Sequence, residues 1–273
     1  MSKTTPDQPI TRRQFLTLPL ALVLIPLALP LRHGSPESRS SRGAYTVDIG
    51  LLYGALTFHL EGTVTETADW AASRYEVRIQ GEGDGISNRI RSIGISSSGR
   101  WTPLETHSSF SVKGRETQSD VTYDWNQRTV VYHYREDTFF LRRLRVADDV
   151  VSIPHGMHLD DSVSATLNYA DQRWPPQPDG TFETHVVRRK RPDNERPDDA
   201  QKAYRAELVP FGFRVTTDPA TGGRTAQFDL TRFSSWARRT RPARITFAPD
   251  GRPEQITMEM ILGTLVKIEL HPS

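Results

Sequence analysis

Residues 74–81 read RYEVRIQG, in which polar and apolar side chains alternate at every position. Tyr75, Val77 and Ile79 fall on one face, and charged or amide side chains occupy the positions between them. Successive side chains of a β-strand point to opposite faces of a sheet, so this period of two predicts a strand. One face is apolar and the other polar, which is typical of an antiparallel sheet with one buried face.

The same alternation recurs along the chain. The apolar positions of these further candidate strands are Leu56, Phe58 and Leu60; Phe110 and Val112; Val121, Tyr123 and Trp125; Val130, Tyr132 and Tyr134; Phe211, Phe213 and Val215; and Ile256, Met258, Met260 and Leu262. Turn-forming segments separate them, namely GEGDG (81–85), SSSGR (96–100), DWNQR (124–128), TGGR (221–224) and PDGRP (249–253). We therefore expect a mainly β domain over residues 44–273.

One segment has helical spacing instead. In HLDDSVSATLNYA (158–170), Asp160 or Asp161 is placed to cap a helix that buries Val163 and Leu167. A long meander with one helix can bury its apolar face as a closed barrel, as two packed sheets, or by curling around the helix. Alternation alone does not choose among these three.

Residues 1–43 lack the alternating pattern of the rest of the chain. Lys3, Arg12 and Arg13 precede an apolar run from Leu16 to Leu31 that contains three prolines. As a helix this run would measure roughly 24 Å, shorter than a bilayer core of about 30 Å. A basic segment before a short apolar run is typical of a secretory signal. We therefore predict a signal sequence over residues 1–32 and a flexible Ser/Arg-rich tether over residues 33–43, with an uncleaved membrane anchor as the alternative.

The residues around Arg12 and Arg13 form a pattern that indicates one type of signal sequence. Arg12, Arg13, Phe15 and Leu16 follow Thr11 in a pattern that resembles the twin-arginine export signal. The resemblance implies that the twin-arginine translocase is a partner during export, and that the folded protein resides in the periplasm.

Charge and cysteine content narrow the classes of function. The whole chain carries a net charge of +2, with 35 Lys/Arg and 33 Asp/Glu; removing the six basic and two acidic residues of positions 1–43 leaves 29 and 31, a charge of −2. A nucleic-acid-binding domain would be basic, so nucleic acid is not an expected partner. The absence of cysteine excludes disulfides, thiolate metal sites and a cysteine nucleophile.

Local catalytic motifs are absent. The sequence contains neither the Gly-x-Ser-x-Gly elbow of serine hydrolases nor a P-loop. His155 and His158 flank a glycine, and we interpret them as part of a structural loop rather than a metal site. The adjacent aspartates 160 and 161 fit turn and cap roles. We therefore assign no catalytic residue, no metal ligand and no cofactor, and we expect a protein that is not an enzyme.

Two basic stretches, VVRRKRPDNERPDD (186–199) and WARRTRPARI (236–245), suit solvated loops. The alternative is contact with an anionic surface of the cell envelope, because such patches attract polyanions with little specificity.

Several segments resemble a family of periplasmic proteins known as domain of unknown function 3108. They are Tyr45–Val47 with Gly54, the tract Ser98–Glu105, Gly114, Tyr123–Trp125 and Asp161–Ala165, so the likeness covers mainly residues 44–170. It implies a single large antiparallel sheet curled into a half-barrel around one or two short helices, similar to envelope lipoprotein carriers of the LolA/LolB kind. It carries over no catalytic residue.

These observations favour an exported, non-enzymatic protein that holds a lipid or another apolar ligand within a curved sheet. The expected lining residues are those phased toward the concave face: Leu56, Phe58, Val77, Phe110, Tyr123 and Tyr132. The first alternative is an envelope scaffold or protein-interaction module whose core is filled by these side chains. The second is a hydrolase or metalloenzyme whose site is assembled from distant strands.

Overall fold

The computed structural model describes residues 38–272 except residues 52, 139, 140, 197 and 239. Within this part of the chain, fourteen strands form one sheet in which every pair of neighbouring strands is antiparallel. The strands are β1 (Ser38–Leu51), β2 (Leu56–Asp69), β3 (Arg74–Gly83), β4 (Ile86–Ser97), β5 (Arg100–Val112), β6 (Arg115–Asp124), β7 (Thr129–Asp137), β8 (Leu144–Ser152), β9 (Thr181–Arg189), β10 (Ala206–Thr217), β11 (Arg224–Phe228), β12 (Ala243–Phe247), β13 (Pro253–Glu259) and β14 (Leu265–Pro272).

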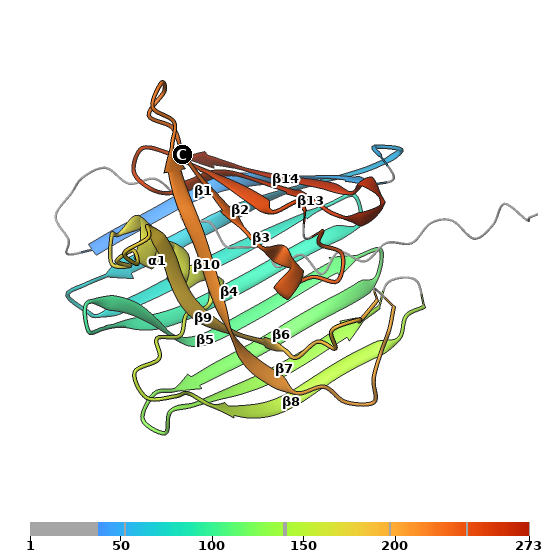
Figure 1. Cartoon of the computed structure of the whole chain (residues 1–273), viewed down its shortest axis with the longest axis horizontal. Helices are drawn as coiled ribbons and strands as arrows, with labels where there is room; N and C mark the ends of the chain where they lie inside the picture. The colour runs from blue at the N-terminus through green and yellow to red at the C-terminus, as the bar shows by residue number, and fades with distance from the viewer. Residues whose placement is uncertain (1–37, 52, 139–140, 197, 239, 273) are drawn as a thin grey trace, which may run out of the picture.

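The chain builds this sheet as two meanders. Strands β1 to β8 follow one another, the chain then crosses to the far edge, and β9 to β14 return until β14 pairs with β1. The edge strands β8 and β9 consequently come from the middle of the sequence. Figure 1 shows β9 and β10 crossing in front of β5–β8, so the sheet curls back on itself.

The two edges meet by overlap. Side chains on the inner face of β6–β8, including Tyr123 and Tyr132, pack against Val187 of β9 and Leu208 of β10. Two short parallel bridges, Ala147 with Tyr204 and Leu159 with His185, add backbone contacts where the edges meet. We call this contact between β6–β8 and β9–β10 the seam. The prediction of one large antiparallel sheet around a short helix is confirmed, and the sheet curls beyond a half-barrel into a nearly closed barrel.

Helix α1 (Ser162–Ala170) lies inside the barrel against β4 and β5. Its N-cap is Asp161, one of the two residues predicted to cap the helix. Asp161 forms a capping box with Ser164. Asn168 fixes the helix to β5, because its side chain accepts from the Trp101 backbone N–H (2.7 Å) and donates to the Trp101 carbonyl (2.9 Å). Two 3₁₀ turns, η1 (Leu230–Arg232) and η2 (Ile261–Gly263), complete the structure.

The beginning of the sheet corrects one prediction. Strand β1 starts at Ser38, so residues 38–43 belong to the domain and are not a flexible tether. Arg39 donates from Nε to the fully buried Glu66 (2.6 Å) and also bonds Asp171 at the end of α1. The basic residue in this polar segment therefore neutralises a carboxylate of the core, and the segment is held as a strand.

The predicted signal sequence, including Arg12, Arg13, Phe15 and Leu16, lies outside the described residues. Among the described residues, no helix combines the length and the apolar character needed to cross a bilayer.

Candidate functional site

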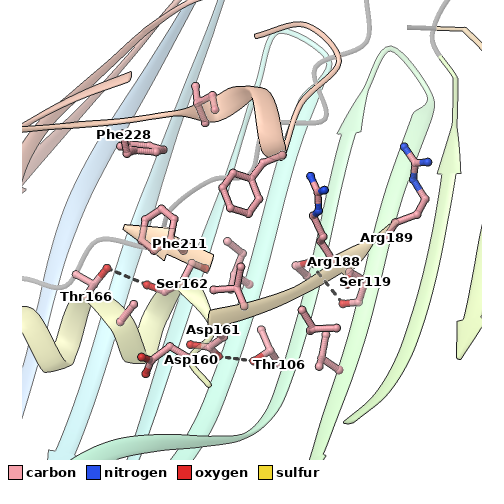
Figure 2. Close-up of a pocket in the computed structure, with 18 of the residues that line it drawn as sticks. Thr106, Ser119, Asp160, Asp161, Ser162, Thr166, Arg188, Arg189, Phe211 and Phe228 are labelled. Carbon is pink, nitrogen blue, oxygen red and sulfur yellow. Dashed lines mark hydrogen bonds between the residues drawn. The ribbon is translucent and has the colours of Figure 1, made fainter. Parts of the chain in front are cut away.

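A cavity of about 260 Å³ lies inside the barrel along one side of α1, from Asp160 and Asp161 at its N-terminal end to Tyr169 in its last turn. One of its walls is aromatic and comes from the second meander. Phe211 contacts Phe228 and Phe233 edge to face, with ring centroids 5.6 and 5.9 Å apart. This wall also contains the apolar residues Val186, Val187, Phe213, Leu230, Ile245, Phe247 and Pro253. In Figure 2, Phe211 and Phe228 lie to the upper left of Thr106 and Ser119, which belong to β5 and β6.

The opposite wall, from β4, β5 and β6, carries many polar side chains on its inner face. Asn88, Thr106, Ser108, Thr117 and Ser119 line the cavity there. The register brings them together, since Ser108 lies opposite Ser119 and Phe110 lies between Asn88 and Thr117. Inward positions of a barrel are usually apolar, so this group of amide and hydroxyl side chains gives the cavity two chemically different walls.

Asp160 and Asp161 lie where the cavity meets the helix, and both are buried. Asp161 accepts from the backbone N–H of Ser164 (2.6 Å) and from the hydroxyls of Ser92 (2.5 Å) and Thr106. Each carboxylate oxygen of Asp161 thus has a donor. Its position is fixed by the helix that it caps and by the two strands that hold it.

Asp160 connects its own loop to three other elements. It accepts from the hydroxyl of Thr184 (2.6 Å), the hydroxyl of Ser164 (2.8 Å), the amide of Asn168 (3.0 Å) and the guanidinium of Arg100 (3.1 Å). The ring Nε2 of His158 lies 3.2 Å from Asp160 Oδ2. The loop, the helix, β5 and β9 therefore converge on one buried carboxylate.

The pKa values of the two carboxyls shift in opposite directions. Burial raises the pKa of Asp160, but His158, Arg100 and Thr184 together outweigh burial and hold it below its usual value. Burial dominates for Asp161, whose pKa is raised despite its hydrogen bonds from Ser92, Thr106 and Ser164. Asp160 thus favours its charged form, whereas Asp161 resists ionisation.

Three arginines of the first basic stretch also line the cavity, and each has an acidic partner. Arg188 of β9 bonds Glu207 of β10 through Nε (2.9 Å) and a terminal nitrogen (2.6 Å). Arg189 makes a two-pronged ion pair with Glu195, at 2.7 Å for both contacts, and Arg191 reaches the same carboxylate at 3.3 Å. These three arginines are therefore paired within the molecule, whereas Lys190, Asp193, Asn194 and Arg196 of the same stretch are exposed.

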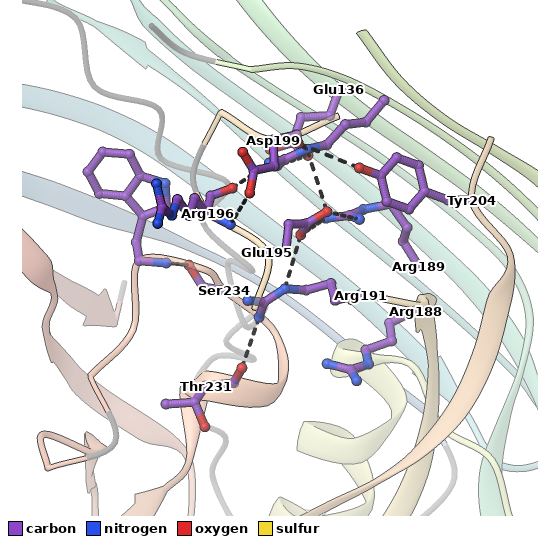
Figure 3. A network of polar contacts seen from close by, with 12 residues as sticks. Glu136, Arg188, Arg189, Arg191, Glu195, Arg196, Asp199, Tyr204, Thr231 and Ser234 are labelled. Carbon is purple, nitrogen blue, oxygen red and sulfur yellow. Dashed lines mark hydrogen bonds and ion pairs between the residues drawn. The ribbon is translucent and has the colours of Figure 1, made fainter. Parts of the chain in front are cut away.

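Glu195 also belongs to a network that closes the seam (Figure 3). Arg145 of β8 bonds Glu136 of β7 (2.9 Å) and the backbone carbonyl of Asp199 (2.7 Å). The guanidinium of Arg189 lies 4.3 Å from the centre of the Tyr204 ring. Because these groups come from both edges of the sheet, the network holds β7–β8 against β9 and the loop that follows it.

The structure brings together three of the six predicted lining residues. Phe110, Tyr123 and Tyr132 line the cavity. Val77, Leu56 and Phe58 do not: Val77 is fully packed in the main core, and Leu56 and Phe58 are partly buried against that core. All six share the inward phase, but the interior next to β2 and β3 is filled by other side chains.

Sequence reasoning missed the aromatic wall and Asp160 as parts of the site. The alternation of Phe211 and Phe213 marks an inward face, so this signal was present for the wall. No local signal marks Asp160, because its partners Arg100 and Thr184 lie 60 and 24 residues away in sequence.

Within the described part of the chain, no group of three or more His, Asp or Glu side chains is gathered closely enough to hold a metal ion. The fold and its interior cavity place the chain in the class of barrel-like antiparallel β proteins.

The chain was compared with protein families, curated proteins and solved structures. No protein-family model matches the chain, and no curated protein matches it. Among solved structures, it is similar to a "beta-barrel-like protein of domain of unknown function DUF1849" from Brucella abortus, with 10% sequence identity and a TM-score of 0.41. That match covers 87% of this chain and 98% of the other.

Proposed function

We propose that the protein binds a lipid or another amphiphilic small molecule in the barrel cavity and performs no reaction on it. The observation that carries this proposal is the pair of unlike walls, aromatic on β10–β12 and rich in hydroxyl groups on β4–β6. Apolar surface that leaves water on binding contributes roughly 25 cal/mol per Å². The aromatic wall would supply this term, and the hydroxyl wall would receive the polar part of the ligand.

The size of the cavity limits the ligand. Small-molecule sites usually enclose about 300–1,000 Å³, so a cavity of about 260 Å³ suits a small ligand. One acyl chain or a compact ring system fits this range better than a lipid with two or more chains.

The charged groups around the cavity favour a ligand without strong charge. Arg188 and Arg189 are already paired with Glu207 and Glu195, and Asp160 accepts four hydrogen bonds. A strongly charged ligand would have to displace one of these partners, which is costly for a buried ion pair. For the same reason neither aspartate is placed as a free general base, in keeping with a binding role.

A titration with N-phenyl-1-naphthylamine, an uncharged and compact fluorescent probe, tests this proposal. Burial of roughly 330 Å² of apolar surface at about 25 cal/mol per Å² corresponds to a dissociation constant in about the micromolar range. We expect saturable binding of one probe per protein, with a blue shift of the probe's emission. A linear, non-saturating signal would contradict binding in a cavity.

Export remains part of the proposal. The pattern at Arg12, Arg13, Phe15 and Leu16, the absence of cysteine and the resemblance to a periplasmic family support twin-arginine export to the periplasm. Cell fractionation of wild type and an Arg12→Lys, Arg13→Lys double variant tests this. We expect wild type in the periplasm and the double variant retained in the cytoplasm; equal distribution of the two would contradict it.

A further inference from the structure

Two neighbouring turns at one end of the barrel expose large apolar side chains. Tyr53 in the β1–β2 turn is 85% exposed, Leu262 in η2 is 44% exposed, and Leu265 at the start of β14 is 51% exposed. Figure 1 shows the blue β1–β2 turn and the red β13–β14 turn at the same end of the molecule, away from α1. We call Tyr53, Leu262 and Leu265 the apolar tip.

The three side chains belong to one structural unit. Leu265 pairs with Gly50 at the base of the β1–β2 turn. The ring of Tyr53 lies directly against Gly263, since a Cβ added to Gly263 would come within 2.5 Å of that ring. Only glycine at position 263 permits this contact, so the two turns are fitted to each other and present their apolar side chains together.

The backbone at Leu262 is strained. Its φ is +57°, in the left-handed region that bulky residues rarely adopt. Such residues cost free energy and persist only where the surroundings hold them, often at functional sites. Here the strained residue is also an exposed leucine, and it precedes Gly263, whose φ of +64° is also positive.

The tip is continuous with the aromatic wall of the cavity. The backbone N–H of Ile261 donates to the carbonyl of Trp236 (2.9 Å), and Met260 forms a bridge with Ala237. Phe233, three residues before Trp236, lines the cavity. The turn that carries Leu262 is therefore bonded to the segment that carries part of the cavity wall.

We propose that the apolar tip inserts into the interface of a lipid bilayer. A stable protein interface buries about 800 Å² on each partner, which three side chains on two tight turns cannot supply. Insertion into a bilayer needs no matching surface, and its strength scales with the apolar area that is buried. Tyrosine, with its apolar ring and polar hydroxyl, is enriched at the level of the lipid head groups.

A position-resolved label tests the contact, because residues 16–31 are apolar as well and binding alone would not locate it. The cysteine-free chain allows Leu262→Cys and, as a control, Val150→Cys, each labelled with a polarity-sensitive fluorophore. Val150 is 59% exposed on β8 and lies outside the tip. With vesicles of phosphatidylethanolamine and phosphatidylglycerol, we expect a blue shift and a several-fold rise in emission at position 262 and neither at position 150. No change at 262, or an equal change at both positions, would overturn the proposal.

Leu262→Gly separates a membrane role from a structural one. Glycine adopts the positive φ without strain, so the melting temperature is expected to equal or exceed that of wild type. Loss of one inserted leucine is expected to raise about tenfold the vesicle concentration that half-saturates the emission change of a label at Leu265→Cys, which reports vesicle binding by the tip itself. Reduced stability with unchanged vesicle binding would contradict the proposal. Neither measurement needs a ligand in the cavity, so both can fail or succeed independently of the proposed ligand binding.

Discussion

Asp160→Ala is expected to destabilise the fold by about 3–5 kcal/mol, the range measured when one partner of a buried ion pair is removed. The substitution leaves Arg100 and the hydroxyl of Thr184 without the carboxylate they share. It also releases Asn168, which holds α1 to β5 through Trp101. Urea unfolding followed by the circular dichroism of the sheet gives the free energy of unfolding.

The matched control is Asp148→Ala. Asp148 also pairs with a histidine, at 2.8 Å from His133, but both side chains are more than half exposed on the outer face of the sheet. Exposed pairs of this kind contribute little, so the control is expected to change stability by no more than about 0.5 kcal/mol. Equal effects of the two substitutions would contradict the structural role given to Asp160.

The pH dependence of stability gives a second readout for Asp160. Its pKa in the folded protein is lower than in the unfolded chain, where it is about 3.8. The stabilisation from this group is therefore fully present above about pH 4 and is lost as the pH falls through the lower folded value. Asp160→Asn is expected to be less stable than wild type at neutral pH and to lose less stability on acidification. A difference between the two proteins that is independent of pH would contradict the lowered pKa.

Ser119→Phe is expected to abolish ligand binding while the fold is retained. Ser119 is on the inner face of β6 and lines the cavity opposite the aromatic wall. A phenyl ring at this position would occupy space that the ligand needs, and we expect the affinity for N-phenyl-1-naphthylamine to fall at least tenfold. The same titration measures the wild type and the variant.

Thr122→Phe is the control for this substitution. Thr122 is three residues further along β6 and is exposed on the outer face, so a phenyl ring there leaves the cavity unchanged. We expect wild-type affinity from this variant. If Ser119→Phe misfolds, Ser108→Phe fills the cavity from the neighbouring strand, since Ser108 lies opposite Ser119. Wild-type affinity in a folded, cavity-filled variant would place the ligand elsewhere.

Much of the fold could be predicted from the sequence because its elements are locally determined. The alternation at Tyr75, Val77 and Ile79 sets the strand and its buried face, and Asp161 caps the helix through Ser164, only three residues away. The boundary of the sheet was not predictable in this way. Arg39 is held in a strand by Glu66 and Asp171, which are 27 and 132 residues distant.

The candidate site depends on contacts between residues distant in sequence more strongly than the fold does. The phase of a strand tells which residues face inward, but it does not tell where the interior remains unfilled. Val77 and Phe110 have the same phase, yet Val77 is packed in the core and Phe110 lines the cavity. The difference depends on how α1 and the seam fill the barrel, which in turn follows from buried groups such as Asp160 and Glu195.

The central claim is that the cavity holds an amphiphilic small molecule, and organic extraction of the protein purified from its native source tests it most directly. Mass spectrometry of the extract is predicted to show one molecular species at about one equivalent per protein from wild type and from Thr122→Phe. The same species is predicted to be absent from folded Ser119→Phe. An extract of wild-type protein that contains no small molecule, or the same amount from Ser119→Phe, would contradict the claim.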